Sequence, residues 1–280
     1  MGGAKKLEAK DLIKGGVLQC AEAATFGMPF EVWKTYMGAN RNESTMQAFR
    51  SVYRSGGFRA FWRGLEAKLV ESALKGAVLL FSKEGLIRTS RSFGMGDIAS
   101  GLIGGFGGGV CQVTVMGPCT FLVTASVASH GTAGQMSMIE RVKHTFGTQG
   151  VSGFYKGGTA LMLRQGSNWA SRQGLTDAVR ARIRKMKSTD KLSIGDEALA
   201  GVIGGCLSTW NQPFEVLRID AQAAGARGEP SKNIFETSGK ILKESGVGGF
   251  FRGVIPRMGL CVAQTLFMVT IPYILTSKGL

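Results

Sequence analysis

The sequence predicts an all-α membrane protein in which six transmembrane helices form three tandem repeats around a pseudo-threefold axis, each with a short amphipathic helix. Two motifs recur in register, and such self-similarity is the signature of tandem repeats. The first, proline followed by an acid and a base, occurs at Pro29–Lys34 and Pro213–Arg218, with a diverged copy at Pro118–Val123. The second, two aromatic residues and a base before a glycine, ends at Gly64, Gly157 and Gly253.

The distribution of charge favours membrane spans over a soluble core. Residues 98–129 and 258–277 contain no Asp, Glu, Lys, Arg or His. Each run reaches the ~20 residues that cross a bilayer as a helix. Residues 198–214 nearly do. Charges interrupt the remaining apolar stretches, as expected where one face of a helix lines water.

Each repeat therefore consists of a long helix, a short helix and a second long helix, within a single domain covering residues 1–280. The repeats span approximately 11–94, 95–192 and 193–277. The expected long helices are 11–39, 65–89, 97–127, 158–185, 195–223 and 254–277. The expected short helices are 45–54, 137–146 and 233–242, and turn-forming residues precede the first and the last of them.

The first long helix of each repeat carries a proline. Because proline removes a backbone hydrogen bond and bends an apolar helix, Pro29, Pro118 and Pro213 are expected to kink helices 1, 3 and 5 at the same depth. Three bent helices around one axis would converge and close a funnel at one end. Rows of glycine at four-residue spacing, as at Gly101 and Gly105, would let these helices approach closely.

The two motifs together resemble the mitochondrial carrier family over roughly residues 11–277. The resemblance implies a multi-pass transporter of the mitochondrial inner membrane that closes on the matrix side by pairing acids and bases of neighbouring repeats. Carried onto this chain, the matrix gate comprises Glu31, Lys34, Glu215, Arg218 and Gln222.

The second repeat departs from the family pattern at this gate. Thr120 and Val123 replace its acid and base, so Arg218 would lack a carboxylate and Glu31 a base. Lys34 with Glu215 is then the only expected ion pair, and an isolated pair in a wet cavity stabilises by at most about 1 kcal/mol. Gln222 corresponds to a glutamine that braces such pairs in the family. At the opposite, cytosolic end the family motif is eroded, and Glu84 with Arg180 is the one inter-repeat pair expected there.

Ionisable residues within spanning helices indicate a substrate site. Seven residues beyond the glycines that end the second motif lie Glu71 and Arg164, at the level where the resemblance places substrate contacts. Arginine suits carboxylates because its planar fork donates two parallel hydrogen bonds. Glu71 with Lys75 has the alternative interpretation of a purely structural pair. The predicted substrate-binding residues are Glu71, Lys75, Arg164, Gln165, Arg172 and Arg257.

The resemblance extends to a subgroup that exchanges citrate and 2-oxoglutarate. It is carried by Met28–Thr35, Glu71–Leu79, Met116–Thr124 and Gln165–Thr176. The implied activity is antiport of di- and tricarboxylates, most simply citrate for 2-oxoglutarate. Backbone amides beside three glycines, with a basic residue before each, are further expected to bind the phosphates of cardiolipin. These lipid-binding residues are Arg63, Gly64, Lys156, Gly157, Arg252 and Gly253.

Composition weighs against several other classes. Five cysteines without CxxC spacing disfavour a disulfide scaffold or a zinc site, and we expect no metal, no cofactor and no enzymatic activity. A net charge of +15 suits anionic lipid and anionic solutes, and nucleic-acid binding is disfavoured because the positive residues are dispersed. Two alternatives stay open: a transport-inactive structural subunit of a larger membrane complex, and a membrane-anchored protein associated with mitochondrial DNA.

Overall fold

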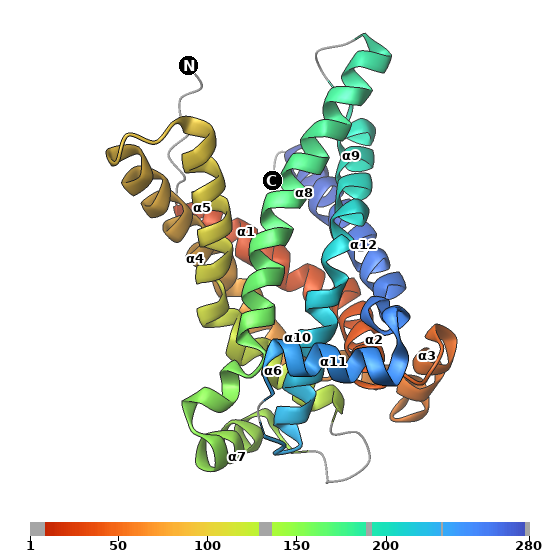
Figure 1. Ribbon diagram of the computed structural model, residues 1–280. Coiled ribbons are helices and arrows are strands. Elements are labelled where there is room, and N and C mark those ends of the chain that lie inside the picture. Colours follow the sequence, from red (N-terminus) through yellow and green to blue (C-terminus); the bar gives the residue numbers. More distant parts are fainter. Residues whose placement is uncertain (1–8, 129–135, 189–191, 231, 278–280) are drawn as a thin grey trace.

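The computed structural model describes residues 9–128, 136–188, 192–230 and 232–277, and within them every regular element is a helix (Figure 1). The first repeat holds α1 (Ala9–Glu22), α2 (Met28–Ala39), α3 (Thr45–Arg54) and α4 (Leu65–Ser92). The second holds α5 (Asp97–Cys111), α6 (Val113–Ala128), α7 (Met138–Gln149) and α8 (Gly158–Lys187). The third holds α9 (Ile194–Leu207), α10 (Gln212–Ala226), α11 (Ile234–Ser245) and α12 (Val254–Ser277).

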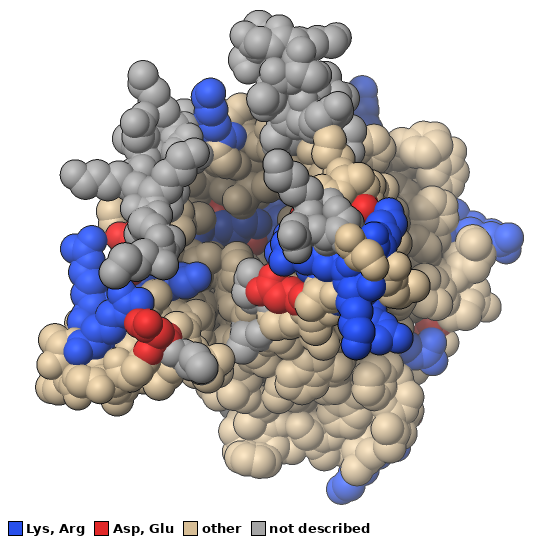
Figure 2. All heavy atoms as spheres, turned by 90° about the horizontal axis from the view of Figure 1, so that it is seen from above, with Lys and Arg blue, Asp and Glu red and all other residues tan. Residues whose placement is uncertain are grey.

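The long helices close into a ring. In chain order α1 contacts α4, α4 contacts α5, α5 contacts α8, α8 contacts α9, α9 contacts α12, and α12 returns to α1 and α2. At one end α2, α6 and α10 all contact one another, and we call this the closed end; it is the lower end in Figure 1, beside the short helices α3, α7 and α11. Seen from above, the ring surrounds a hollow in which charged side chains are visible (Figure 2).

Local sequence explains where the short helices begin. Ser44, Ser137 and Asn233 each accept a hydrogen bond from the backbone N–H three residues on, and the side chain at that position returns a bond to the cap. Such capping boxes satisfy two otherwise unpaired donors and stabilise a helix start by about 1 kcal/mol. The ends of the expected helices differ from the observed ones by only a few residues.

The first long helix of each repeat is broken into two pieces, and the positions of these breaks differ from the expectation. In repeats one and three an irregular turn, η1 (Ala23–Gly27) or η4 (Ser208–Asn211), precedes the proline, which then occupies the first turn of α2 or α10. Proline is tolerated there because its missing N–H would have no partner. In repeat two the chain bends by 42° at Gln112, and Pro118 lies inside α6. The three prolines therefore do not mark three equivalent bends.

Pro118 nevertheless has a local consequence. A proline inside a helix cannot donate to the carbonyl four residues earlier, which here belongs to Thr114. The Tyr155 hydroxyl donates to that carbonyl at 2.9 Å. Tyr155 belongs to η3 (Val151–Tyr155), one of three 3-10 turns that precede the even-numbered long helices, with η2 (Gly57–Trp62) and η5 (Val247–Phe251).

By length and apolar composition, no single helix among the described residues qualifies as a membrane span, whereas the bent pair Ala99–Cys111 and Val113–Ala128 qualifies when taken together.

Candidate functional site

A buried carboxylate, Glu215 on α10, joins the three repeats at the closed end. Lys34 Nζ from α2 lies 2.7 Å from its Oε1, and Arg218 donates to both carboxylate oxygens at 2.9 and 3.0 Å. Arg164 Nε from α8 lies 3.1 Å from Oε2 without hydrogen-bond alignment. The Glu215 side chain is 1% exposed, so these contacts form with little competition from water.

Further ion pairs extend the network from the closed end into the hollow. Glu31 lies 2.9 Å from Lys34 and 4.0 Å from Lys68. Glu71 then accepts a hydrogen bond from Lys68 at 2.9 Å and lies 3.9 Å from Lys75. Charges of alternating sign therefore run from α2 along α4, and they connect the predicted matrix gate with the predicted substrate level.

The gate departs from the sequence prediction in two contacts. The expected Lys34–Glu215 contact is present. The expectation that Glu31 and Arg218 lack partners is wrong, since Glu31 pairs with Lys34 and Arg218 with Glu215. Both corrections have the same physical reason: residues three apart on a helix lie on the same face, so an acid and a base within one motif can pair.

Neutral hydrogen bonds occupy the position of the charges missing from repeat two. The amide oxygen of Gln222 accepts bonds from Arg218 Nη1 at 2.7 Å and from the Thr124 hydroxyl at 3.0 Å. Its amide nitrogen donates to Thr120 Oγ1 at 3.0 Å. Gln222 thus braces Arg218 against α6, as a polar bridge between repeats two and three that contains no carboxylate.

A second buried ion pair links repeats one and three beside the gate. Arg41, after α2, donates to Asp220 of α10 at 2.5 Å and to Glu244 of α11 at 2.7 Å, and Lys240 lies 3.5 Å from Asp220. Burial lowers the pKa of Arg41, but the bonds to the two carboxylates outweigh this effect and raise that pKa above its ordinary value. Sequence reasoning missed this pair because the positions that correspond to Asp220 in the other two repeats, Tyr36 and Ala125, are uncharged.

Above the gate, polar side chains hold the predicted substrate residues of α4 and α8 together. Arg164 Nη2 donates to Gln165 Oε1 at 2.6 Å. The Gln165 amide donates to Gln112 Oε1 at 3.0 Å, and the Gln112 amide donates to the Lys75 carbonyl at 2.8 Å. The structure therefore brings Glu71, Lys75, Arg164 and Gln165 into one connected cluster.

The remaining two predicted substrate residues have neutral partners. Arg257 is buried on α12 and donates to Gln212 Oε1 at 2.9 Å and to Asn211 Oδ1. Arg172, two turns above Arg164 on α8, donates to Thr265 Oγ1 at 3.4 Å. Neither arginine has a carboxylate within 4 Å among the residues that the structure describes, so neither guanidinium group is held in an ion pair there.

Sequence reasoning missed three amide side chains, Gln112, Asn211 and Gln212, which lie where the first long helix of repeats two and three is broken. Their hydrogen bonds, described above, hold the second long helices of the repeats, α4, α8 and α12. Each stands within an uncharged stretch, residues 98–129 or 198–214. A long polar amide in an apolar span needs a hydrogen-bond partner, and this was the available signal.

The expected cytosolic gate is not formed in this structure. Glu84 lies 3.6 Å from Arg88 on its own helix, and Arg180 donates to Asp177 at 2.9 Å and to Glu197 of α9 at 2.8 Å. Glu84 and Arg180 therefore have other partners in this structure, and their pairing stays a prediction. The reason is that the helices that carry them converge at the closed end and are apart at the other (Figure 1).

The three glycines predicted to bind lipid have a structural role that sequence reasoning did not give. Each precedes an even-numbered long helix with a positive φ, 78°, 72° and 79° for Gly64, Gly157 and Gly253. A side chain there would be strained, because L-residues rarely adopt this conformation. An added Cβ would also lie within 3.0–3.1 Å of the backbone of Val123, Arg218 and Lys34 respectively. The second long helix of each repeat therefore begins against the last residue of the proline motif in the next repeat, the position that holds the base in Lys34 and Arg218.

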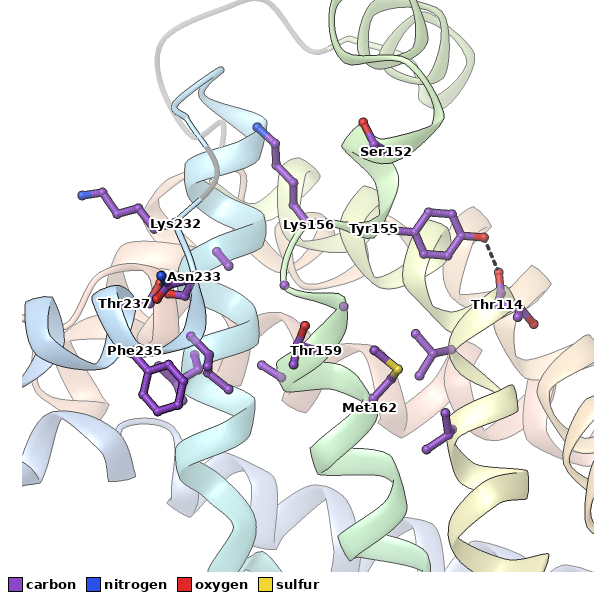
Figure 3. Close-up of a pocket in the computed structure, with 18 of the residues that line it drawn as sticks. Thr114, Ser152, Tyr155, Lys156, Thr159, Met162, Lys232, Asn233, Phe235 and Thr237 are labelled. Atoms are coloured by element: carbon purple, nitrogen blue, oxygen red, sulfur yellow. Dashed lines mark hydrogen bonds between the residues drawn. The ribbon is translucent and has the colours of Figure 1, made fainter.

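The basic residues before these glycines bond to backbone carbonyls. Arg63 donates to Ser55, Lys156 to Glu229 and Arg252 to Glu43, at 2.8, 2.9 and 3.1 Å. Between repeats two and three lies a groove of about 1060 Å³. The start of α8, the start of α11 at Asn233 and the side chains of Lys156 and Lys232 line this groove (Figure 3). It combines two helix N-termini with two ammonium groups, a combination that suits anionic headgroups.

Comparisons with known proteins agree with this architecture. The profile of the family described as "Mitochondrial carrier protein" matches residues 7–92, 96–187 and 190–275. The "Citrate/oxoglutarate carrier protein" of Saccharomyces cerevisiae is 37% identical over 279 residues, which are 95% of this chain and 88% of that protein. The "Tricarboxylate transport protein, mitochondrial" of Homo sapiens is 29% identical over 226 residues, 79% of this chain and 72% of that protein. "Tricarboxylate transport protein B, mitochondrial" of Danio rerio is 28% identical over 258 residues, which are 88% of this chain and 79% of that protein.

Proposed function

Because this chain belongs to the mitochondrial carrier family, we propose that it is an antiporter of the mitochondrial inner membrane that exchanges citrate for 2-oxoglutarate or a related di- or tricarboxylate. The relatives named above are carriers of such anions. The large apolar side chains exposed on the outer faces of the ring, such as Phe81, Leu102 and Ile255, support lipid contact around six spans.

One observation carries the proposal: Arg164, the predicted anion contact, lies against Glu215 of the matrix gate. A substrate carboxylate competes with Glu215 for this guanidinium, and it enters from the hollow, where Lys75 is also available. The contact with Glu215 is unaligned, whereas a substrate can offer the fork two parallel acceptors. Substrate binding would then remove one of three cations from Glu215.

Loss of that contact couples substrate binding to opening of the closed end. The buried ion pairs of Lys34, Arg164 and Arg218 with Glu215 compensate one another's desolvation, and removing one partner from such a pair costs about 3–5 kcal/mol. An anion that binds Arg164 in place of Glu215 leaves Glu215 with one cation fewer, and this weakens the gate by part of that free energy. Exchange follows only if the anion binds the intermediate conformation more tightly than either open one.

Exchange in liposomes tests the assignment. Purified wild-type protein is reconstituted with internal 2-oxoglutarate, and uptake of labelled citrate is measured. Arg164→Ala is expected to abolish uptake, and Arg88→Ala, whose side chain is 83% exposed, serves as the control and keeps it. Uptake by Arg164→Ala at the wild-type rate would refute the contact, and absence of any carboxylate exchange by the wild type would refute the proposed function.

We further propose that cardiolipin occupies the groove between repeats two and three. The phosphates would accept hydrogen bonds from the amides at the starts of α8 and α11, near Lys156 and Lys232. The equivalent positions, Arg63 with Gly64 and Arg252 with Gly253, would serve the other two seams. Cardiolipin should raise the melting temperature of the wild type, and Lys232→Ala should reduce that rise.

The contacts at the closed end bear on the alternatives. A transport-inactive structural subunit was suggested by a gate with a single ion pair between repeats, and the second contact between repeats, Arg164 with Glu215, weighs against that argument. Association with mitochondrial DNA rested on the net charge and on the resemblance to the citrate and 2-oxoglutarate subgroup. A steep fall of DNA affinity with salt would be required to revive it.

A further inference from the structure

A tryptophan of α8, Trp169, is hydrogen-bonded at the bend of repeat two, although it is not among the predicted substrate residues. Its indole nitrogen donates to Gln112 Oε1 at 2.8 Å. The same oxygen accepts a hydrogen bond from the Gln165 amide at 3.0 Å. Trp169 follows Gln165 by four residues, so the two side chains lie on one face of α8 and both reach the single oxygen of Gln112.

The partners of Gln112 allow its amide only one orientation. The indole nitrogen of Trp169 can only donate, so it requires the amide oxygen. The Lys75 carbonyl can only accept, so it requires the amide nitrogen, which donates to it at 2.8 Å. Gln112 is 2% exposed, so water does not compete for these bonds. A reversed amide would bring donor against donor and acceptor against acceptor.

The orientation of Gln112 in turn fixes the next amide. Gln165 directs its nitrogen toward Gln112 Oε1 at 3.0 Å and toward Met116 Sδ at 2.9 Å. The oxygen of Gln165 is then left for Arg164, whose Nη2 donates to it at 2.6 Å. We call Trp169, Gln112 and Gln165 the polar relay, because it determines which end of an amide faces the guanidinium.

Loss of the polar relay would change how Arg164 is held. A reversed Gln165 amide would present N–H groups to a guanidinium that itself has only donors. Arg164 would lose an acceptor and turn toward Glu215, whose Oε2 already lies 3.1 Å from its Nε. A stronger bond to Glu215 would leave less of the fork for a substrate carboxylate, so the relay favours the orientation that binds an anion.

Close helix packing brings the indole to this place. A Cβ added to Gly109 of α5 would lie 3.0 Å from Trp169 Cδ1 and 3.1 Å from the Gln165 carbonyl oxygen. Both distances are shorter than an ordinary contact between carbon atoms, about 3.5–4.0 Å. Glycine at position 109 therefore lets α5 approach α8 closely enough for the indole to reach Gln112.

The polar relay is confined to repeat two. Counted from the glycine that precedes each even-numbered long helix, the positions equivalent to Trp169 in repeats one and three are Gly76 and Thr265. A feature that the fold of every repeat required would recur in all three. This one occurs in the repeat that supplies Arg164, which connects it with anion binding.

We propose that Trp169 is a positioning residue for the anion site: through Gln112 it fixes the Gln165 amide, and thereby holds Arg164 ready for a substrate carboxylate. The inference rests on the proposed exchange and adds to it a residue that acts without touching the anion. One lost hydrogen bond between neutral groups corresponds to a change in affinity of about three- to tenfold.

Removal of the indole N–H tests this role. In Trp169→Phe an aromatic ring remains, but the donor to Gln112 is lost. The KM for citrate uptake into liposomes that contain 2-oxoglutarate should rise about three- to tenfold, with a maximal rate close to that of the wild type. The rise in melting temperature caused by citrate should require correspondingly more citrate. Trp210→Phe, the same change at an indole side chain that is 54% exposed on η4, is the matched control and should leave both measurements unchanged.

A double-mutant cycle separates positioning from packing. Gln112→Met removes the amide through which Trp169 acts and should raise the KM at least as much. Because the indole acts only through that amide, adding Trp169→Phe to Gln112→Met should change the KM no further. Two independent packing defects would instead multiply their effects.

The outcomes separate this inference from the proposed function. A wild-type KM in Trp169→Phe, or effects that multiply in the double variant, overturns the role of Trp169. Absence of carboxylate exchange by the wild type overturns the proposed function instead, and the melting shifts with citrate then test the relay by themselves. Should Trp169→Phe not fold, Gly109→Ala, whose Cβ would displace the indole, is measured in the same way, and an unchanged KM there also overturns the proposal.

Discussion

The buried Arg41–Asp220 pair allows a direct measurement of how strongly repeats one and three are held together beside the gate. The two side chains are 7% and 8% exposed, and their closest atoms are 2.5 Å apart. The pair Arg227–Glu229 has nearly the same separation, 2.6 Å, but its side chains are 45% and 41% exposed. The two pairs differ in burial and in sequence separation, since Arg41 and Asp220 are 179 residues apart and Arg227 and Glu229 only two, so the second pair serves as an exposed, local reference.

Coulomb's law gives the expected magnitude. With charge centres about 4 Å apart, the interaction is about 4 kcal/mol at the effective dielectric constant of a partly buried site and about 1 kcal/mol in water. Glu244 and Lys240 share the buried pair, so we expect a coupling energy of about 2–3 kcal/mol for Arg41 with Asp220. The exposed pair should give at most about 1 kcal/mol.

Double-mutant cycles measured by thermal unfolding test this estimate. The variants are Arg41→Ala, Asp220→Ala and their combination, beside the same three changes at Arg227 and Glu229. In a chain of this size about 1 kcal/mol corresponds to about 2 °C in melting temperature, so the buried cycle should show a coupling of about 4–6 °C and the exposed cycle at most about 2 °C. Equal couplings in the two cycles would show that burial does not strengthen the pair, and the reasoning would be refuted.

Two further outcomes are expected. Gly157→Ala should destabilise by about 1–2 kcal/mol, because φ is 72° and the new Cβ would lie 3.1 Å from the Arg218 carbonyl. Gly147→Ala, in a helix with open space around it, should stabilise by about 0.5–1 kcal/mol in the same melts, and the opposite order would contradict this account. The Arg227 hydrogen bond lowers the pKa of Glu229, so its stabilisation should be present above the unfolded carboxyl pKa of about 4.3 and lost as pH falls through the lower folded value. Melts of wild type and Arg227→Ala across that range should converge at low pH; a constant difference would contradict it.

The fold was largely predictable because each repeat contains local signals that start and end its helices. Glycines with positive φ, such as Gly150 and Gly246, end two short helices, and capping residues such as Ser137 and Asn233 begin them. Such signals act within a few residues of the chain, so they can be recognised in the sequence without knowing which helices pack together. The bend at Gln112 was not predicted, because its position depends on how α5 and α6 pack against other helices.

The candidate site was predictable in its residue types and less so in its partners. The repeat register identified Arg164 and Lys34, but it could not show that both reach Glu215. The Arg41–Asp220 contact joins segments far apart in the chain, and neither helical periodicity nor the repeat pattern predicts it.

The ion pairs at the closed end are unevenly shared among the three boundaries between repeats. Lys34–Glu215 and Arg41–Asp220 cross between repeats one and three, and Arg164–Glu215 crosses between repeats two and three. Among the described residues, no ion pair at this end crosses between repeats one and two. When the closed end opens, α2 and α6 should therefore separate earliest, and the first water molecules to enter from that end should advance along that boundary.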